Sequence, residues 1–388
     1  MSETTSSPGS EPRRRAVLRS FRQLWRHRYF RRLLAVRVAV QSSDGVLQVA
    51  LAAYVLFSPE RQPDATSIAI VLAITLLPFS ILGPFAAVVI DRVSRRQVLV
   101  VANIARAAVT LGLAFLVWSG LQSVGVVVLI YGGLLLAMSL NRFLLAALSA
   151  SLPHTIDPSE YMVANSVVPT VGPAGLLIGV AVATPLRLIL GHMMPDYRAN
   201  AILFLIAVAG FLVSAVMALW IPRKQLGPDG TEPKMKARDV VGGLVEAVAH
   251  LRSRRPAGIG LLTIGAHRLV QGIVTVATIL VFRNYFHSPD QLDPAIADLG
   301  LLVVITGTGF VLASVVTPSM SARVGLRATM IICLVASAVF QVMPGAIYTW
   351  ATQMVAAFLL GLTAQGIKIG VDTLVQAHVA DEFKGRVF

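Results

Sequence analysis

The stretch AVQSSDGVLQV contains Asp44, the only carboxylate near the middle of a long apolar run in this sequence. An ionisable side chain at such a position is costly in lipid and therefore points to a functional site. Burial and a neighbouring positive charge act on its ionisation in opposite directions, so such a group can take up and release a proton. Arg37 lies seven residues earlier, close to two helical turns, and can face the same side. We expect Asp44 to couple protons or bind substrate; the alternatives are a structural partnership with Arg37 or a polar contact between helices.

Basic side chains also occur inside apolar runs. Arg106 is one of five, and as a group they favour an anionic or zwitterionic substrate. Long basic chains can instead extend to the membrane interface, and Lys368 can pair with Asp372, four residues later. The candidate substrate and proton-coupling residues are therefore Asp44, Arg37, Arg142, Arg268 and Lys368.

A second group of charges follows the apolar run in GPFAAVVIDRVSRRQV. Its members are Asp91, Arg92, Arg95 and Arg96. Arginines just beyond a membrane span are expected from topology alone, whereas an acid there is not. Asp91 can pair with arginines or with the positive N-terminal end of a helix. Asp91 is therefore the member of this group that topology leaves unexplained.

Gly172 and Pro173 stand together in another apolar run, VPTVGPAGLLIG. Proline removes a backbone hydrogen bond and glycine has no side chain, so the pair predicts a break or a kink in a helix. An ordinary membrane-helix kink and a transport-specific one are both compatible with the pattern.

The sequence lacks the motifs that several kinds of chemistry require. No Gly-x-x-x-x-Gly-Lys-(Ser/Thr) segment occurs, which argues against ATP as the energy source. The seven histidines and the single cysteine are scattered without metal-ligand spacing, and no nucleophile–base pair can be defined. We therefore expect no enzyme activity, no cofactor and no metal.

The composition explains what solvent surrounds these residues. Of the 388 residues, 56% are hydrophobic and only 13% are charged, and the mean hydropathy is +0.75. A soluble protein carries about 25% charged residues, so this chain could not cover a surface facing water. The long apolar runs predict an all-α membrane protein with ten transmembrane helices. Their approximate ranges are 33–57, 67–90, 97–119, 123–148, 163–187, 200–221, 257–282, 298–320, 328–346 and 348–372.

The distribution of Lys and Arg predicts the orientation. With a cytoplasmic N-terminus, 24 of these residues fall on the inner side and four on the outer side. This positive-inside bias assigns the net charge of +14 to the cytoplasmic membrane surface rather than to a nucleic acid. We expect a multi-pass protein of the plasma or inner membrane that binds no nucleic acid and works as a monomer.

An internal repeat divides the chain. At an offset of 231 residues, Arg92 and Arg96 correspond to Arg323 and Arg327, and Arg37 corresponds to Arg268. Two such matches at one offset indicate two parallel-repeat helical bundles. The second bundle shows four spans instead of six, so two of an expected twelve are predicted to be missing. The expected segments are a basic tail (1–32), an N-terminal bundle (33–221), a cytoplasmic linker with an amphipathic helix (222–256) and an incomplete C-terminal bundle (257–388).

These features together resemble the major facilitator superfamily. The charged loop is similar to the family signature Gly-x-x-x-Asp-Arg-x-Gly-x-(Arg/Lys)-(Arg/Lys), with Ala87 and Ser94 at the glycine positions. Arg142 resembles the family's fourth-span arginine. The series Gly172, Pro173, Gly175 and Gly179 is similar to the fifth-span signature of its antiporters.

The resemblance implies two six-helix bundles around a central cavity and a loop at Asp91 that latches them on the cytoplasmic side. It also implies alternating access, and it is nearest to bacterial twelve-span drug and siderophore exporters. We expect proton-coupled efflux of small amphipathic molecules. The alternatives are an importer or facilitator of a metabolite or siderophore, and a non-transporting sensor or scaffold on the same fold.

Overall fold

The computed structural model describes residues 24–56, 90, 93–121, 123–157, 161–227, 253–288 and 291–378. Most of the predicted second span (67–90) and the loop residues Asp91 and Arg92 lie outside these residues. Of the predicted linker helix, Gly242, Glu246 and Ala249 are described as well, and all three are helical and exposed. All regular elements in the described part of the chain are helices.

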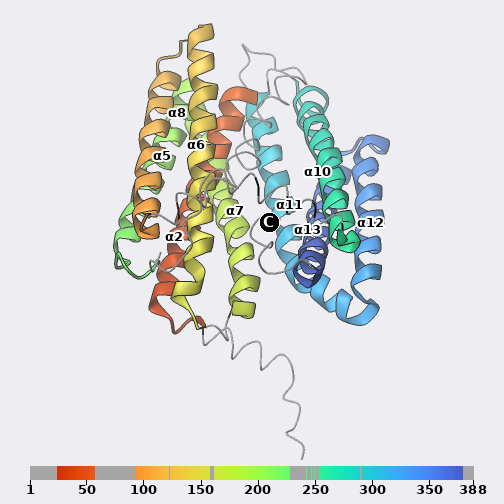
Figure 1. Cartoon of the computed structure of the whole chain (residues 1–388). Helices are drawn as coiled ribbons and strands as arrows, with labels where there is room; N and C mark the ends of the chain where they lie inside the picture. The colour runs from red at the N-terminus through yellow and green to blue at the C-terminus, as the bar shows by residue number, and fades with distance from the viewer. Residues whose placement is uncertain are drawn as a thin grey trace, which may run out of the picture.

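Two groups of helices lie side by side (Figure 1). The N-terminal half contains α2 (Arg28–Leu51), η1 (Ala52–Leu56), α5 (Arg95–Trp118), α6 (Val124–Ser151), η2 (Leu152–Thr155), α7 (Tyr161–Met193) and α8 (Asp196–Leu219). The C-terminal half contains α10 (Arg255–Val281), η4 (Phe282–Phe286), α11 (Leu292–Val324), α12 (Leu326–Ala346) and α13 (Trp350–His378).

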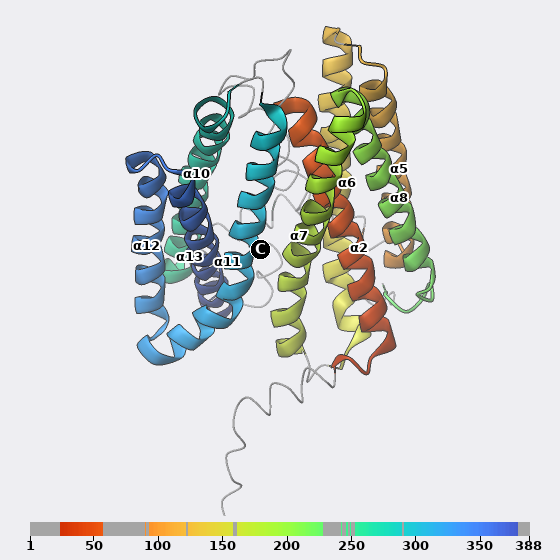
Figure 2. The same ribbon diagram turned by 180° about the vertical axis from the view of Figure 1, so that it is seen from behind.

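The prediction of ten spans is not supported as made. The described residues contain nine α-helices, of which eight are long and apolar enough to cross a membrane. The ninth is α2, whose middle carries several polar residues, including Arg37, Gln41 and Asp44. A helix can keep polar groups at membrane depth when neighbouring helices bury them, and α2 packs against both α7 and α8 (Figure 2).

Small residues allow α2 and α7 to pack closely. Gly45 lies against Gly179, and a Cβ added at either position would collide with the backbone of the other helix. Gly175, one turn before Gly179, receives a 2.9 Å hydrogen bond at its carbonyl oxygen from Ser42 Oγ. Small residues four apart are a general means of bringing membrane helices together. The fifth-span glycines therefore form a packing surface, and α7 continues unbroken through Gly172 and Pro173.

Arginines join the helix ends of the N-terminal half. Arg95 is buried and its Nη1 donates to the carbonyl oxygens of Ala150 (3.0 Å) and Leu226 (3.2 Å). Arg96 Nη2 donates to Leu219 O, at the last turn of α8, over 3.1 Å. Carbonyl groups at a helix end have no partner within the helix, so these contacts satisfy them. Arg95 and Arg96, predicted to lie in a gating loop, thus bind within their own half.

The two halves share local features at the offset found in the sequence. The helices α5 and α12 begin at Arg95 and Leu326, 231 residues apart. Among the described helices, α2 and α10 are each followed by a short π-helix, η1 and η4, whose first residues are 230 apart.

Candidate functional site

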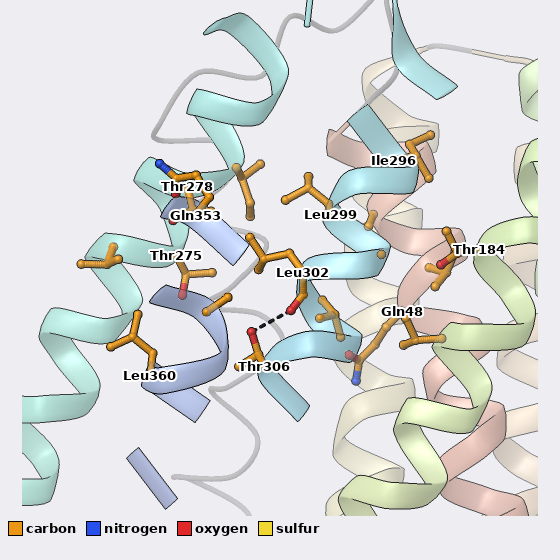
Figure 3. Close-up of a pocket in the computed structure, with 18 of the residues that line it drawn as sticks. Gln48, Thr184, Thr275, Thr278, Ile296, Leu299, Leu302, Thr306, Gln353 and Leu360 are labelled. Atoms are coloured by element: carbon orange, nitrogen blue, oxygen red, sulfur yellow. Dashed lines mark hydrogen bonds between the residues drawn. The ribbon is translucent and has the colours of Figure 1, made fainter. Parts of the chain in front are cut away.

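A cavity of about 380 Å³ lies between the two halves. Gln48 and Thr184 line it from α2 and α7, and residues of α10, α11 and α13 line the opposite side (Figure 3). Its volume falls within the range of small-molecule sites, about 300–1,000 Å³. A cavity built by both halves changes its shape whenever the halves move relative to each other.

The described lining combines an apolar wall with a few polar groups. Seven of its 22 residues are polar and none is charged. The polar residues are Gln48, Thr184, Gln271, Thr275, Thr278, Thr306 and Gln353. Three of them, Gln271, Thr275 and Thr278, follow one another at helical spacing on α10, so they share a face.

Contacts between α7 and α11 close the cavity on one side. Gly300 is so close to Thr184 that a Cβ at this glycine would lie 3.1 Å from the Thr184 Cβ. Gly307 packs in the same way against the side chain of Leu177. Because both glycines belong to the C-terminal half and their partners to the N-terminal half, these contacts must separate if the halves move apart here.

An ion pair crosses between the halves beyond these contacts. Arg187, near the end of α7, is 1% exposed, and its Nη1 lies 3.6 Å from the carboxylate of Asp293 on α11. The same guanidinium donates to Asp196 and to Asn200 of α8, each over 2.5 Å. Arg187 is thus held within its own half by α8 and linked to the other half through Asp293.

The two acids that contact Arg187 provide a matched comparison. Asp293→Asn removes the charge that links the halves, whereas Asp196→Asn removes a charge within one half. A partly exposed ion pair contributes about 1 kcal/mol, so we expect Asp293→Asn to increase the open population about fivefold. A cysteine at Gln48, in a Cys333→Ser background, measures opening through its rate of alkylation by an impermeant maleimide added from the side on which α7 ends. Equal alkylation rates in the two variants would contradict a linking role for Asp293.

Asp44 pairs with a different arginine from the one suggested by the sequence. Its carboxylate accepts a hydrogen bond from Arg106 Nη2, of α5, and the two side chains are 1% and 0% exposed. The Arg106 guanidinium also lies 4.0 Å from the centre of the Phe211 ring, of α8, in a cation–π contact. A structural partnership of Asp44 with Arg37 was therefore wrong, because Asp44 faces α5 within the N-terminal half.

Arg37 occupies another side of α2. A Cβ at Gly172 would lie 3.4 Å from Arg37 Nε and Nη2, so the missing side chain of Gly172 leaves room for this guanidinium. The Nε and Nη1 atoms of Arg37 have no hydrogen-bond partner among the described residues. The glycine of the Gly172-Pro173 pair thus accommodates a buried arginine.

The other candidate residues lie apart from one another. Arg268 is exposed on α10, and its Nη1 donates to Gln271 Oε1 over 2.9 Å. Lys368 pairs with Asp372 on α13, as their spacing allowed. Arg142 is partly buried on α6 and interacts with a neighbouring group. None of the five candidates, Asp44 included, is among the described residues that line the cavity.

Sequence reasoning missed the uncharged polar residues of the cavity. Threonine and glutamine are common in membrane helices as contacts between helices, so composition alone does not mark them. The helical spacing of Gln271, Thr275 and Thr278 was an available signal, since it places three polar groups on one face of a span.

Comparisons with known proteins agree with this architecture. A profile described as Major Facilitator Superfamily matches residues 33–287. Uncharacterized MFS-type transporters of Mycobacterium tuberculosis and Mycobacterium bovis are each 35% identical over 368 residues, which is 92% of this chain and 80% of theirs.

Solved structures show the same fold at low sequence identity. The nucleoside transporter NupG is 13% identical with a TM-score of 0.63, over 92% of this chain and 84% of that one. The xylose transporter XylE from E. coli, in a partially occluded inward-open conformation, is 14% identical with a TM-score of 0.62, over 92% and 88%. With its profile match, its relatives and its two facing helical halves, this multi-pass membrane chain belongs to the major facilitator superfamily.

Proposed function

We propose that the protein is a secondary-active exporter of small amphipathic molecules that works by alternating access. The cavity carries this proposal, because helices of both halves line it. Rocking one half against the other would expose such a cavity to each side of the membrane in turn. The α7–α11 contacts and the Arg187–Asp293 pair would then form when the cavity is closed on their side.

The lining supports an amphipathic substrate. Fifteen apolar residues can bury a hydrocarbon or aromatic body, while seven polar ones can orient it. The basic residues at the ends of α5 and α8, including Arg96 and Arg223, support placing that end of the protein in the cytoplasm. A cytoplasmic N-terminus in the plasma or inner membrane follows from this assignment.

Protons are the coupling ion in this proposal, and Asp44 is the group that carries them. Protonation of Asp44 would neutralise the acid opposite Arg106 and leave the guanidinium to find another partner. Because this buried pair joins α2 to α5, a change in its charge state would shift the two helices relative to each other. The change would reach the cavity along α2, because Gln48 lies one turn beyond Asp44.

Asp44→Asn tests the coupling in proteoliposomes. Transport of a diverse compound panel is measured twice, once driven by an imposed pH gradient and once as exchange without any gradient. We expect the Asp44→Asn variant to lose gradient-driven accumulation about tenfold or more and to keep exchange, since exchange requires no proton transfer. Unchanged gradient-driven accumulation would remove Asp44 from the coupling mechanism, and loss of both modes would assign it a structural role.

A further inference from the structure

We propose that the cavity between the halves binds an uncharged ligand that carries an amide or hydroxyl group on an apolar body. This inference rests on the proposed transport function and narrows its substrate class. It departs from the anionic or zwitterionic substrate that the basic residues of the spans suggested.

The first argument is the absence of a counter-charge. No described residue of the lining is charged, and the stretch 67–89, beyond the described residues, contains no Asp, Glu, Lys or Arg. Arg268 contacts one lining residue, since its Nη1 donates to Gln271 Oε1 over 2.9 Å, but it is not itself among the described residues of the lining. A ligand with a formal charge would lose its hydration without gaining a partner, which costs several kcal/mol.

The second argument is the hydrogen-bonding capacity that the lining leaves open. Gln271 Oε1 is occupied by Arg268, so the amide NH₂ of Gln271 remains as a donor. Gln353 shows the reverse: its Nε2 donates to Pro344 O over 3.1 Å, so its Oε1 remains as an acceptor. One donor and one acceptor from neutral amides match a ligand that itself carries a neutral amide.

The threonines add acceptors. Thr275 donates its hydroxyl proton to Gln271 O over 2.8 Å, within α10. Thr306 donates in the same way to Leu302 O over 2.7 Å, within α11 (Figure 3). A hydroxyl whose proton is used in this way still has lone pairs for a ligand N–H or O–H. These groups therefore favour a ligand with hydrogen-bond donors that carry no charge.

Thr184 contributes to the cavity wall a hydroxyl group whose hydrogen bonding is incomplete. It is 8% exposed, and its Oγ1 is buried without a hydrogen-bond partner among the described residues. A buried hydroxyl without a partner is rare because its desolvation is not compensated. Thr184 lies on the cavity wall with its Oγ1 packed against Gly300, so rotation of this side chain or opening of the α7–α11 contact would let a bound amide or hydroxyl complete its hydrogen bonding.

Matched probes of equal shape test this inference. The probes are 2-naphthamide (neutral), 2-naphthoate (anionic) and 2-naphthamidine (cationic), and binding to the full chain in nanodiscs is measured by equilibrium dialysis. We expect the amide to bind at least about tenfold more tightly than either ion, because the ions lose hydration without gaining a counter-charge. Tighter or equal binding of an ion, or no saturable binding of the amide, overturns the inference.

Thr184→Val locates the binding in this cavity. The substitution keeps the shape of the side chain and removes the hydroxyl, so we expect amide affinity to fall about three- to tenfold. The thermal stability of the empty protein should stay the same or rise, because an unpaired buried hydroxyl is lost. The control is Thr308→Val, which removes a hydroxyl in the same way. Thr308 donates to Ile305 O on α11 and is not among the described lining residues. Unchanged amide affinity in Thr184→Val would overturn the inference.

Flux in proteoliposomes separates this inference from the proposed function. If the amide binds as expected but the protein adds no flux of any probe beyond that of protein-free liposomes, the ligand class stands and the transport function fails. If an ion both binds more tightly and crosses, transport stands and the uncharged ligand class fails.

Discussion

Asp44→Ala is expected to lower the free energy of unfolding by about 3–5 kcal/mol. It leaves Arg106 buried beneath Phe211 without its acid. A guanidinium stays charged under all physiological conditions, so it cannot escape this cost by losing a proton. The midpoint temperature of thermal unfolding is measured on the detergent-purified protein, followed by size-exclusion chromatography.

The partner substitution should be milder. Arg106→Ala leaves Asp44, which can be neutralised by taking up a proton, so its cost is lower and should decrease further at low pH. An apolar double substitution of similar size, Asp44→Leu with Arg106→Met, should recover most of the stability lost in Asp44→Ala, because no buried charge is left. Equal stability of Asp44→Ala and the wild-type protein would show that the pair is not a buried structural ion pair.

Gly179→Ala is expected to destabilise the protein by about 3 kcal/mol, although only one methyl group is added. The new Cβ would collide with Ser42 O and lie 3.0 Å from Gly45 Cα. These are backbone atoms, so no side chain can rotate away and α2 must separate from α7. The cavity would be distorted as well, because both helices line it.

Gly132→Ala is the matched control for Gly179→Ala. Gly132 lies on α6, and a Cβ there would have no described atom within 4 Å. Alanine is favoured over glycine inside a helix by up to about 1 kcal/mol, so Gly132→Ala should leave the thermal midpoint unchanged or raise it. The two substitutions are chemically identical and are predicted to act with opposite sign. If both raise the midpoint, α2 and α7 do not pack through their glycines.

The sequence was sufficient to predict features that depend only on residues close to one another along the chain. The positions of eight spans in the described part of the chain follow from the length of apolar runs, and the Lys368–Asp372 pair follows from helical spacing. The two halves could be recognised because Arg96 and Arg327 stand at the same place in α5 and α12. Each of these inferences needs only the geometry of one helix.

The candidate site could be predicted only in part, because it depends on which helices pack together. The partner of Asp44 is 62 residues away on α5, whereas Arg37 is close in the sequence but lies against α7. Arg95 was predicted to lie in a gating loop, yet it is buried and donates to the end of α6 and to the segment after α8. The polar lining of the cavity escaped prediction for the same reason, since its threonines and glutamines meet only in the tertiary structure.

Disulfide cross-linking between the halves tests most directly whether the cavity works by alternating access. The variant is Thr184→Cys with Gly300→Cys, in a Cys333→Ser background that removes the native cysteine. The two Cβ positions are 3.1 Å apart, closer than the roughly 3.5–4.5 Å of a disulfide, so a small separation of α7 and α11 lets the bond form. The rate of substrate exchange in proteoliposomes is compared before oxidation, after oxidation and after reduction, and each single-cysteine variant serves as a control. Oxidation should abolish exchange in the double variant alone, and reduction should restore it. Full exchange by the cross-linked protein would show that the halves do not separate along α7 and α11, and would contradict this account.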